Sequence, residues 1–155
     1  MLNKLLNYNN IYQLWVNKGS TEEAAIELTI QQLDALEEIV SDEDSWEALL
    51  DISARGRNYD AWLATDWPDG FDELLICVPL CKFVNWECSK CTVGRRQDNN
   101  SCAMDYSLFG YIGELVKNAE RTELLAHISN TRKMLKNGNY IWNVHKCELE
   151  VLNSY

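Results

Sequence analysis

Apolar residues recur at helical spacing along much of this chain, most clearly in residues 20–40. Five apolar side chains there are separated by three or four residues: Ile26, Ile30, Leu33, Leu36 and Val40. This spacing predicts an amphipathic helix with one buried stripe. Ser20 and Glu23 form a capping-box pattern, so the helix is predicted to begin at Ser20. Its acidic residues fall on a different face, which is either plain solvated surface or a docking strip.

Similar patterns predict several shorter helices. The predicted segments are the stretch up to Val16, 44–56, a short segment after Asn58, 71–77, 105–117 and 120–136. Asp44 or Ser45 is expected to cap the second segment, and Asp105 or Ser107 the fifth, because short polar side chains accept hydrogen bonds from helix N-termini. Residues 67–70 predict a turn, and Gly138 is expected to end the last helix.

Residues 84–104 show no clean period and are predicted to form an irregular loop. Gly110 and Gly113 follow inside a predicted helix, where each costs about 1 kcal/mol relative to alanine. They indicate either close backbone packing, with this loop as the candidate neighbour, or a chance irregularity. Residues 139–155 fit either a strand pair or a last helix.

The predicted fold is therefore all-α, with six to eight short helices, an irregular metal-stapled loop and a possible small β element at the C-terminus. At 155 residues the chain is expected to form a single domain, 1–155. Within it we distinguish a helical half (1–76), a cysteine-rich region (77–104) and a helical C-terminal part (105–155).

Neither a secretory leader nor a membrane span is expected. The N-terminal apolar run is too short for a leader, and nothing approaches the ~18 apolar residues that a span requires. We therefore expect a cytoplasmic protein in a reducing compartment, where clustered cysteines serve metal binding better than disulfides.

The two halves of the chain differ in charge. Residues 1–76 contain 16 Asp and Glu against 4 Lys and Arg, whereas residues 77–155 contain 8 against 10. The first half is therefore at net −12 and the second at +2, giving −10 in total. Such an acidic half repels a phosphate backbone and attracts a basic protein, so nucleic-acid binding through it is unfavourable. The alternative is an acidic surface that serves only solubility.

Five cysteines lie within 26 residues, at Cys77, Cys81, Cys88, Cys91 and Cys102. Zn²⁺ prefers four tetrahedral ligands, and a C-x2-C pair presents two thiolates from one turn. We predict structural zinc on Cys81, Cys88, Cys91 and Cys102, with Cys77 as the alternate ligand or a neighbouring thiol. An iron–sulfur cluster, or cysteines without a metal, are the other possibilities.

The same residues carry a resemblance. Pro79-Leu80-Cys81-Lys82-Phe83, then Cys88-Ser-Lys-Cys91-Thr-Val and Cys102, resemble a cysteine signature of small, poorly characterised phage and bacterial proteins. The resemblance covers residues 77–104, with Cys77 one residue further from Cys81 than usual and Thr92 where proline is common. It implies a metal knot and a mobile-element context, and no activity.

No catalytic motif is present: the sequence has no P-loop, G-x-S-x-G or H-E-x-x-H. His127 is expected at a core edge or on the surface. His145 and Cys147 share a face if the tail is a strand, but a thiolate–imidazole pair also needs an orienting group. We therefore predict that the protein is not an enzyme; chemistry at the metal is the least favoured alternative.

The sequence favours a protein-binding inhibitor of a basic partner. Such partners include a toxin or nuclease neutralised by an immunity protein, as in contact-dependent growth inhibition, and a host effector blocked by a phage protein. The predicted docking face consists of Glu38, Asp42, Glu43, Asp44, Glu47 and Asp51, with Trp46 as an aromatic anchor if it points outward. The alternative is a zinc-containing nucleic-acid-binding or regulatory module that uses Lys82, Lys90, Arg95 and Arg96.

Overall fold

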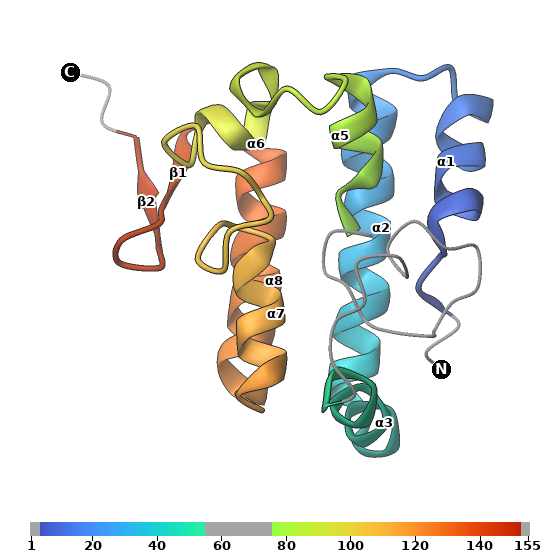
Figure 1. Ribbon diagram of the computed structural model, residues 1–155, viewed down its shortest axis with the longest axis vertical. Coiled ribbons are helices and arrows are strands. Elements are labelled where there is room, and N and C mark those ends of the chain that lie inside the picture. The colour runs from blue at the N-terminus through green and yellow to red at the C-terminus, as the bar shows by residue number, and fades with distance from the viewer. Residues whose placement is uncertain (1–3, 55–75, 153–155) are drawn as a thin grey trace.

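The computed structural model describes residues 4–54 and 76–152 (Figure 1). This part of the chain is mainly helical and ends in a small antiparallel sheet. The helices are α1 (Tyr8–Asn17), α2 (Glu22–Ser41), α3 (Glu43–Ala54), α5 (Val78–Phe83), α6 (Thr92–Arg95), α7 (Gly110–Lys117) and α8 (Arg121–Lys136). One 3-10 turn, η3 (Cys88–Lys90), precedes α6, and the strands are β1 (Tyr140–Asn143) and β2 (Glu148–Val151). The all-α prediction with a C-terminal β element is confirmed.

Helix α2 is capped one residue later than predicted. The Thr21 hydroxyl accepts a hydrogen bond from the Ala24 amide at 3.1 Å, whereas Ser20 has φ +55° and belongs to the turn after α1. The buried stripe is also rotated from the predicted one. Its largest members are Leu28, Leu33, Leu36, Ile39 and Val40, while Ile26 and Ile30 are only partly buried. Because α2 packs against helices on more than one side, its buried face is wider than a single stripe.

Asp42 caps α3, where Asp44 or Ser45 was predicted. Its carboxylate accepts hydrogen bonds from the Ser45 amide at 3.0 Å and the Ser45 hydroxyl at 2.7 Å. These bonds lower the pKa of Asp42. The predicted helix after Asn58, the 67–70 turn and nearly all of the predicted 71–77 helix lie outside the described residues.

The segment that was predicted to be irregular contains two short helical turns, η3 and α6, joined by tight turns. Helix α7 begins later than predicted, at Gly110, whose amide donates to the Ser107 hydroxyl at 3.0 Å. A Cβ on Gly110 would lie 1.9 Å from the Met104 carbonyl oxygen. The predicted close approach of this glycine to the preceding loop is confirmed.

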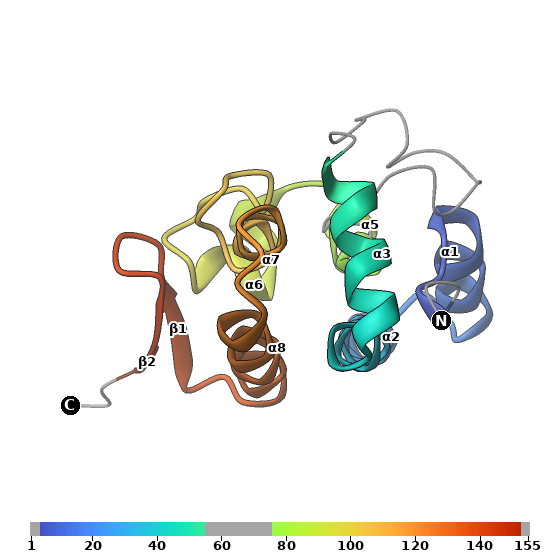
Figure 2. The same ribbon diagram turned by 90° about the horizontal axis from the view of Figure 1, so that it is seen from below.

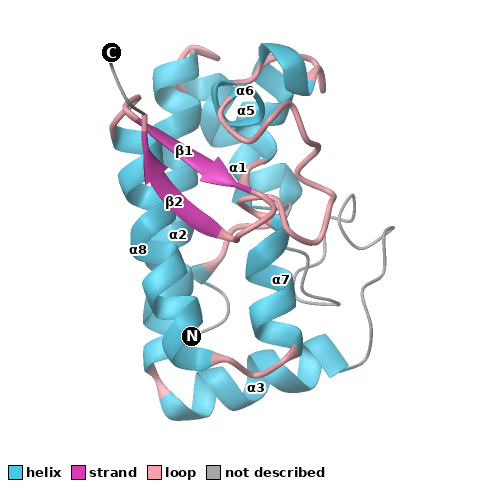
Figure 3. Ribbon diagram, turned by 90° about the vertical axis from the view of Figure 1, so that its left-hand side faces the viewer, coloured by secondary structure: helices cyan, strands magenta, loops and turns pink. Residues whose placement is uncertain are grey.

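The helices form a layered bundle around α2. Helices α1 and α5 contact one side of α2, α8 contacts the other, and α3 packs against both α2 and α7. Figure 2 shows this order from α1 to the hairpin, and Figure 3 shows the β1–β2 hairpin on the outer side of α8. The hairpin pairs Tyr140 with Val151 and Asn143 with Glu148. Buried apolar side chains from both halves form one core cluster.

Candidate functional site

Helix α5 brings the first two cysteines together. The Cys77 and Cys81 sulfurs lie 3.9 Å apart, on one face of the first helical turn. Pro79 occupies the second helical position, where its missing N–H costs no hydrogen bond. The condition for a shared face, that Pro79 permits the helix, is therefore met.

The C-x2-C pair is presented by η3 and the start of α6. Cys88 begins η3, and Cys91 immediately precedes α6. A Cβ on Gly94 would lie 2.0 Å from the Cys88 carbonyl oxygen, so the chain can make this turn only with glycine there.

Cys102 connects the two cysteine pairs. Its thiol is hydrogen-bonded to Cys77, and its sulfur accepts a hydrogen bond from the Gln97 amide at 3.4 Å. The bond from Cys77 lowers the pKa of Cys102 more than burial raises it. Hydrogen bonds to Cys102 and Cys81, together with burial, raise the pKa of Cys77 well above its usual value. Gln97 is fully buried and also accepts from the Leu108 amide at 2.8 Å, which fixes its orientation.

Cys88 and Cys91 complete the sulfur cluster, which we define as Cys77, Cys81, Cys88, Cys91 and Cys102. Burial raises the pKa of both thiols, and nearby Cys102 and Cys81 raise it further. Neighbouring N–H and O–H groups lower the pKa of the same two thiols. The Gly94 and Val93 amides lower the pKa of Cys91; the Cys102 amide and Ser101 hydroxyl lower that of Cys88.

All five predicted ligand residues are thus brought into one neighbourhood, and none is in a disulfide. As the side chains stand, no group of three or more His, Cys, Asp or Glu among the described residues is arranged to hold a metal ion. The sixth cysteine, Cys147, lies in the turn between β1 and β2. Gln97 is the member of this site that sequence reasoning missed, since a glutamine in a loop carries no signal of burial.

The predicted docking face lies at the α2–α3 corner and along α3, with its carboxylates exposed. Some of them have partners within the chain. Glu38 pairs with Lys4, and Glu43 pairs with Arg121 at 2.8 Å. Asp44, Glu47 and Asp51 are exposed on α3, and we call these three the α3 acidic face.

Trp46 is buried, with 5% of its surface exposed. The condition for its role as an anchor, that it points outward, is therefore not met. Trp15 and Trp142 are also buried, whereas Trp86 is 42% exposed. Most tryptophans in the described part of the chain thus serve the core.

The basic residues near the sulfur cluster do not form one free surface. The Arg96 guanidinium donates to the carbonyl oxygens of Met134 and Asn137, both at 2.9 Å, and of Tyr140 at 3.3 Å. It therefore satisfies carbonyls at the C-terminal end of α8. Lys90 pairs with Glu87 at 3.0 Å. Two of the four basic residues of the predicted alternative, Lys90 and Arg96, therefore have partners within the chain.

Lys82 is also held within the molecule. Its ammonium lies 5.7, 5.3 and 5.6 Å from the ring centroids of Tyr8, Tyr12 and Trp86. Trp86 has φ +63°, which is unusual for a bulky residue. These cation–π contacts join α1 to the turn after α5.

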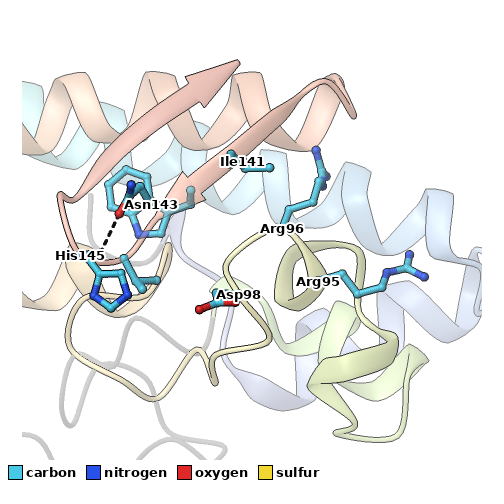
Figure 4. A pocket seen from close by; sticks show the side chains of 8 residues that line it. Arg95, Arg96, Asp98, Ile141, Asn143 and His145 are labelled. Carbon is cyan, nitrogen blue, oxygen red and sulfur yellow. Dashed lines mark hydrogen bonds between the residues drawn. The ribbon is translucent and has the colours of Figure 1, made fainter. Parts of the chain in front are cut away.

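A cavity of about 360 Å³ lies between the loop after α6 and the hairpin. Figure 4 shows Asp98 and His145 on its wall, with the Arg95 guanidinium directed away from them. The His145 amide donates to the Asn143 side chain at 3.0 Å. Because the charged groups do not converge, the cavity has no evident catalytic arrangement.

The histidine and the last cysteine of the tail lie in a turn, so the condition for their sharing a strand face is not met. His145 and Cys147 both belong to the turn between β1 and β2, and burial raises the pKa of Cys147. A raised pKa disfavours the thiolate that a nucleophilic cysteine needs.

Comparison with known proteins gives no match: no family model, curated protein or solved structure is similar to the chain. No helix in the described residues is long and apolar enough to span a membrane.

Proposed function

We propose that this protein is an inhibitor that binds a basic protein partner through the α3 acidic face. The observation that carries the proposal is the distribution of charge over α2 and α3. Residues 22–51 contain eleven Asp and Glu and no Lys or Arg. A uniform run of this kind produces a local negative potential, which steers a basic protein toward it and disfavours acidic ones.

Several acidic side chains of α2 and of the α2–α3 corner form ion pairs within the molecule. Arg132 neutralises Asp34 and Glu37, Arg121 pairs with Glu43, and Lys4 pairs with Glu38. The Asp42 carboxylate caps α3. Asp44, Glu47 and Asp51 are all exposed, at spacings of three and four residues along one helix. A regular row of exposed carboxylates suits the cationic groove of a nuclease or toxin.

The partner class follows from this chemistry. A nuclease must present cationic groups to bind its phosphate substrate, and carboxylates can occupy the same groove. An immunity protein against a basic toxin or nuclease, or a phage-encoded inhibitor of a basic host effector, fits this description. Structural zinc at the sulfur cluster would support the fold rather than the contact, and the proposal assigns no catalytic step to the chain.

The test uses the full chain and two matched triple variants as baits in lysate of the native host. One variant neutralises the α3 acidic face: Asp44→Asn, Glu47→Gln and Asp51→Asn. The other neutralises three exposed acids elsewhere: Glu23→Gln, Glu27→Gln and Glu148→Gln. Both variants change the net charge of the protein by +3, so a difference in binding between them cannot come from overall charge.

We expect the wild type and the second variant to capture and inhibit the same basic protein. The first variant should bind it at least about tenfold more weakly, a loss of about 1.4 kcal/mol. The association rate should fall as salt is raised. Equal behaviour of the two variants, or capture that nuclease digestion abolishes, would overturn the proposal.

A further inference from the structure

The C-terminal hairpin has one open strand edge. In Figure 1 and Figure 2, β2 is the outermost element, beyond β1 and α8. Among the described residues it pairs with β1 alone. A strand with an open edge presents backbone N–H and C=O groups that can pair with a strand of another chain.

Hydrogen bonds of β1 identify which backbone groups of β2 face outward. The Trp142 amide donates to the Arg96 carbonyl at 2.8 Å, and the Tyr140 carbonyl accepts from the Arg96 guanidinium at 3.3 Å. Both groups therefore point away from β2. Trp142 is paired with Leu149, and Tyr140 with Val151. In an antiparallel ladder the residues opposite such groups also point outward, so the N–H and C=O of Leu149 and Val151 lie on the open edge.

The side chains of β2 alternate between an apolar and an acidic face of the hairpin. Leu149 packs against the core, and Val151 lies on the same face with 65% of its surface exposed. Glu148 and Glu150 lie on the other face, where Glu150 accepts a hydrogen bond from the Asn143 side chain at 2.8 Å. The strand contains no lysine and no proline, the residues that commonly block edge pairing.

The two carboxylates disfavour a second copy of the chain on this edge. When two β2 strands pair antiparallel, Leu149 can face its own copy or Val151 of the other strand. The first register places Glu148 opposite Glu150, and the second places Glu150 opposite Glu150. Like charges directly opposite each other destabilise a strand pair, whereas opposite charges stabilise it. The acidic face therefore favours a strand with Lys or Arg at alternate positions.

We propose that the open edge of β2 binds an extended segment of another protein as a third, antiparallel strand, in which apolar and basic residues alternate. The apolar residues of this segment exchange backbone hydrogen bonds with Leu149 and Val151 and extend the apolar face. Its basic side chains lie beside Glu148 and Glu150. The proposal uses neither α3 nor its carboxylates, so it does not depend on the inhibitor function.

The test uses the full chain and a short synthetic peptide of alternating lysine and valine. We expect this peptide to bind and to slow amide hydrogen exchange at Leu149 and Val151, whose N–H groups it covers. N-methyl groups on its valines remove the donors that face β2 and should weaken binding at least about tenfold. N-methyl groups on its lysines point away from β2 and should leave binding unchanged. A peptide with glutamate in place of lysine should bind at least about tenfold more weakly.

Two pairs of variants test the same edge from the side of the protein. Val151→Pro removes an outward N–H without breaking a bond to β1, so it should weaken binding of the lysine peptide about tenfold, whereas Val151→Thr keeps the N–H and should not. Glu148→Lys with Glu150→Lys should reverse the preference toward the glutamate peptide. The triple variant that neutralises the α3 acidic face should bind the lysine peptide as the wild type does.

Equal binding of the two methylated peptides would show that the attraction is electrostatic alone and would refute the added strand. The same conclusion follows if exchange at Leu149 and Val151 does not slow on binding. Protection of these amides that rises with protein concentration in the absence of peptide would identify a second copy as the occupant and would also refute the proposal.

Discussion

The imidazole of His127 is enclosed between α7, α8 and β1, with 3% of its surface exposed. Its ring lies 5.0 Å from that of Tyr111 and 4.8 Å from that of Trp142. Nε2 is 2.7 Å from the Leu108 carbonyl oxygen, which only accepts, so Nε2 carries the hydrogen. Burial lowers the pKa of His127 to about 4, with the bond to Leu108 acting in the opposite direction. The expected core-edge position is therefore deeper than predicted.

This burial predicts a pH dependence of stability. In the unfolded chain the histidine pKa is about 6.5, so the unfolded state binds more protons between pH 6.5 and 4. The contribution is fully present above pH 6.5 and is lost as pH falls toward 4, by on the order of 3 kcal/mol. His127→Gln keeps a donor but does not titrate, so its free energy of unfolding should fall less over this range. Urea denaturation at pH 4.5, 5.5 and 7 measures the difference; parallel curves for both proteins would contradict it.

At the scale of elements, the C-terminal end of α8 is capped by the side chain of the residue that follows α6. Gly138 was predicted to end this helix; α8 ends at Lys136, with Asn137 as its C-cap, and the φ of Gly138 is not positive. The Arg96 guanidinium instead binds carbonyls at the helix end, and the Arg96 carbonyl accepts from the Trp142 amide at 2.8 Å. One residue therefore joins α6, α8 and β1.

This arrangement predicts different roles for two neighbouring arginines. Arg96→Met should lower the free energy of unfolding by about 2 kcal/mol, because charged donors to buried carbonyls contribute about 1.5–3 kcal/mol. It should also speed amide hydrogen exchange in the last turn of α8. Arg95→Met removes the same charge from an exposed position and should change stability by less than about 0.5 kcal/mol. Similar losses in both variants would show that charge alone, and not the cap, matters here.

The sequence predicted the positions of the long helices better than the residues that cap them. Helix periodicity located α2 and α8 almost to the residue, since it depends on local spacing that any amphipathic helix must obey. The cap of α2 was misplaced because Ser20 and Thr21 have the same capping chemistry, and only the fold decides between them. Arg96 lies 38 residues from Met134, and a single sequence gives no indication of such a pairing.

At the scale of the whole molecule, packing of the two halves against each other pairs some acidic side chains of the first half with basic side chains of the second. The sequence predicted an acidic first half and a slightly basic second half. It could not predict that Arg132 of α8 lies against Asp34 and Glu37 of α2, nearly a hundred residues away. Clustering of the cysteines, by contrast, was predictable because short spacings keep their sulfurs within reach. The hydrogen bond from the buried Gln97 amide to the Cys102 sulfur, in contrast, becomes visible only in the fold.

The contact between the halves predicts a loss of stability that depends on salt. Arg132 is 20% exposed and bridges two carboxylates, with Nη1 2.7 Å from Asp34, and both carboxylates raise the pKa of Arg132. Arg132→Met should therefore lower the free energy of unfolding by about 1 kcal/mol in low salt, since such pairs are partly screened by solvent. Lys133→Met makes the same change in net charge at an exposed neighbour and should have little effect. Urea denaturation of both variants at low salt and at about 0.5 M salt separates the contribution of the ion pairs from that of packing. Salt screens the ion pairs of Arg132 but does not weaken the apolar packing of α2 on α8. If the variants differ equally at both salt concentrations, packing of the Arg132 stem holds the halves together and the ion pairs do not.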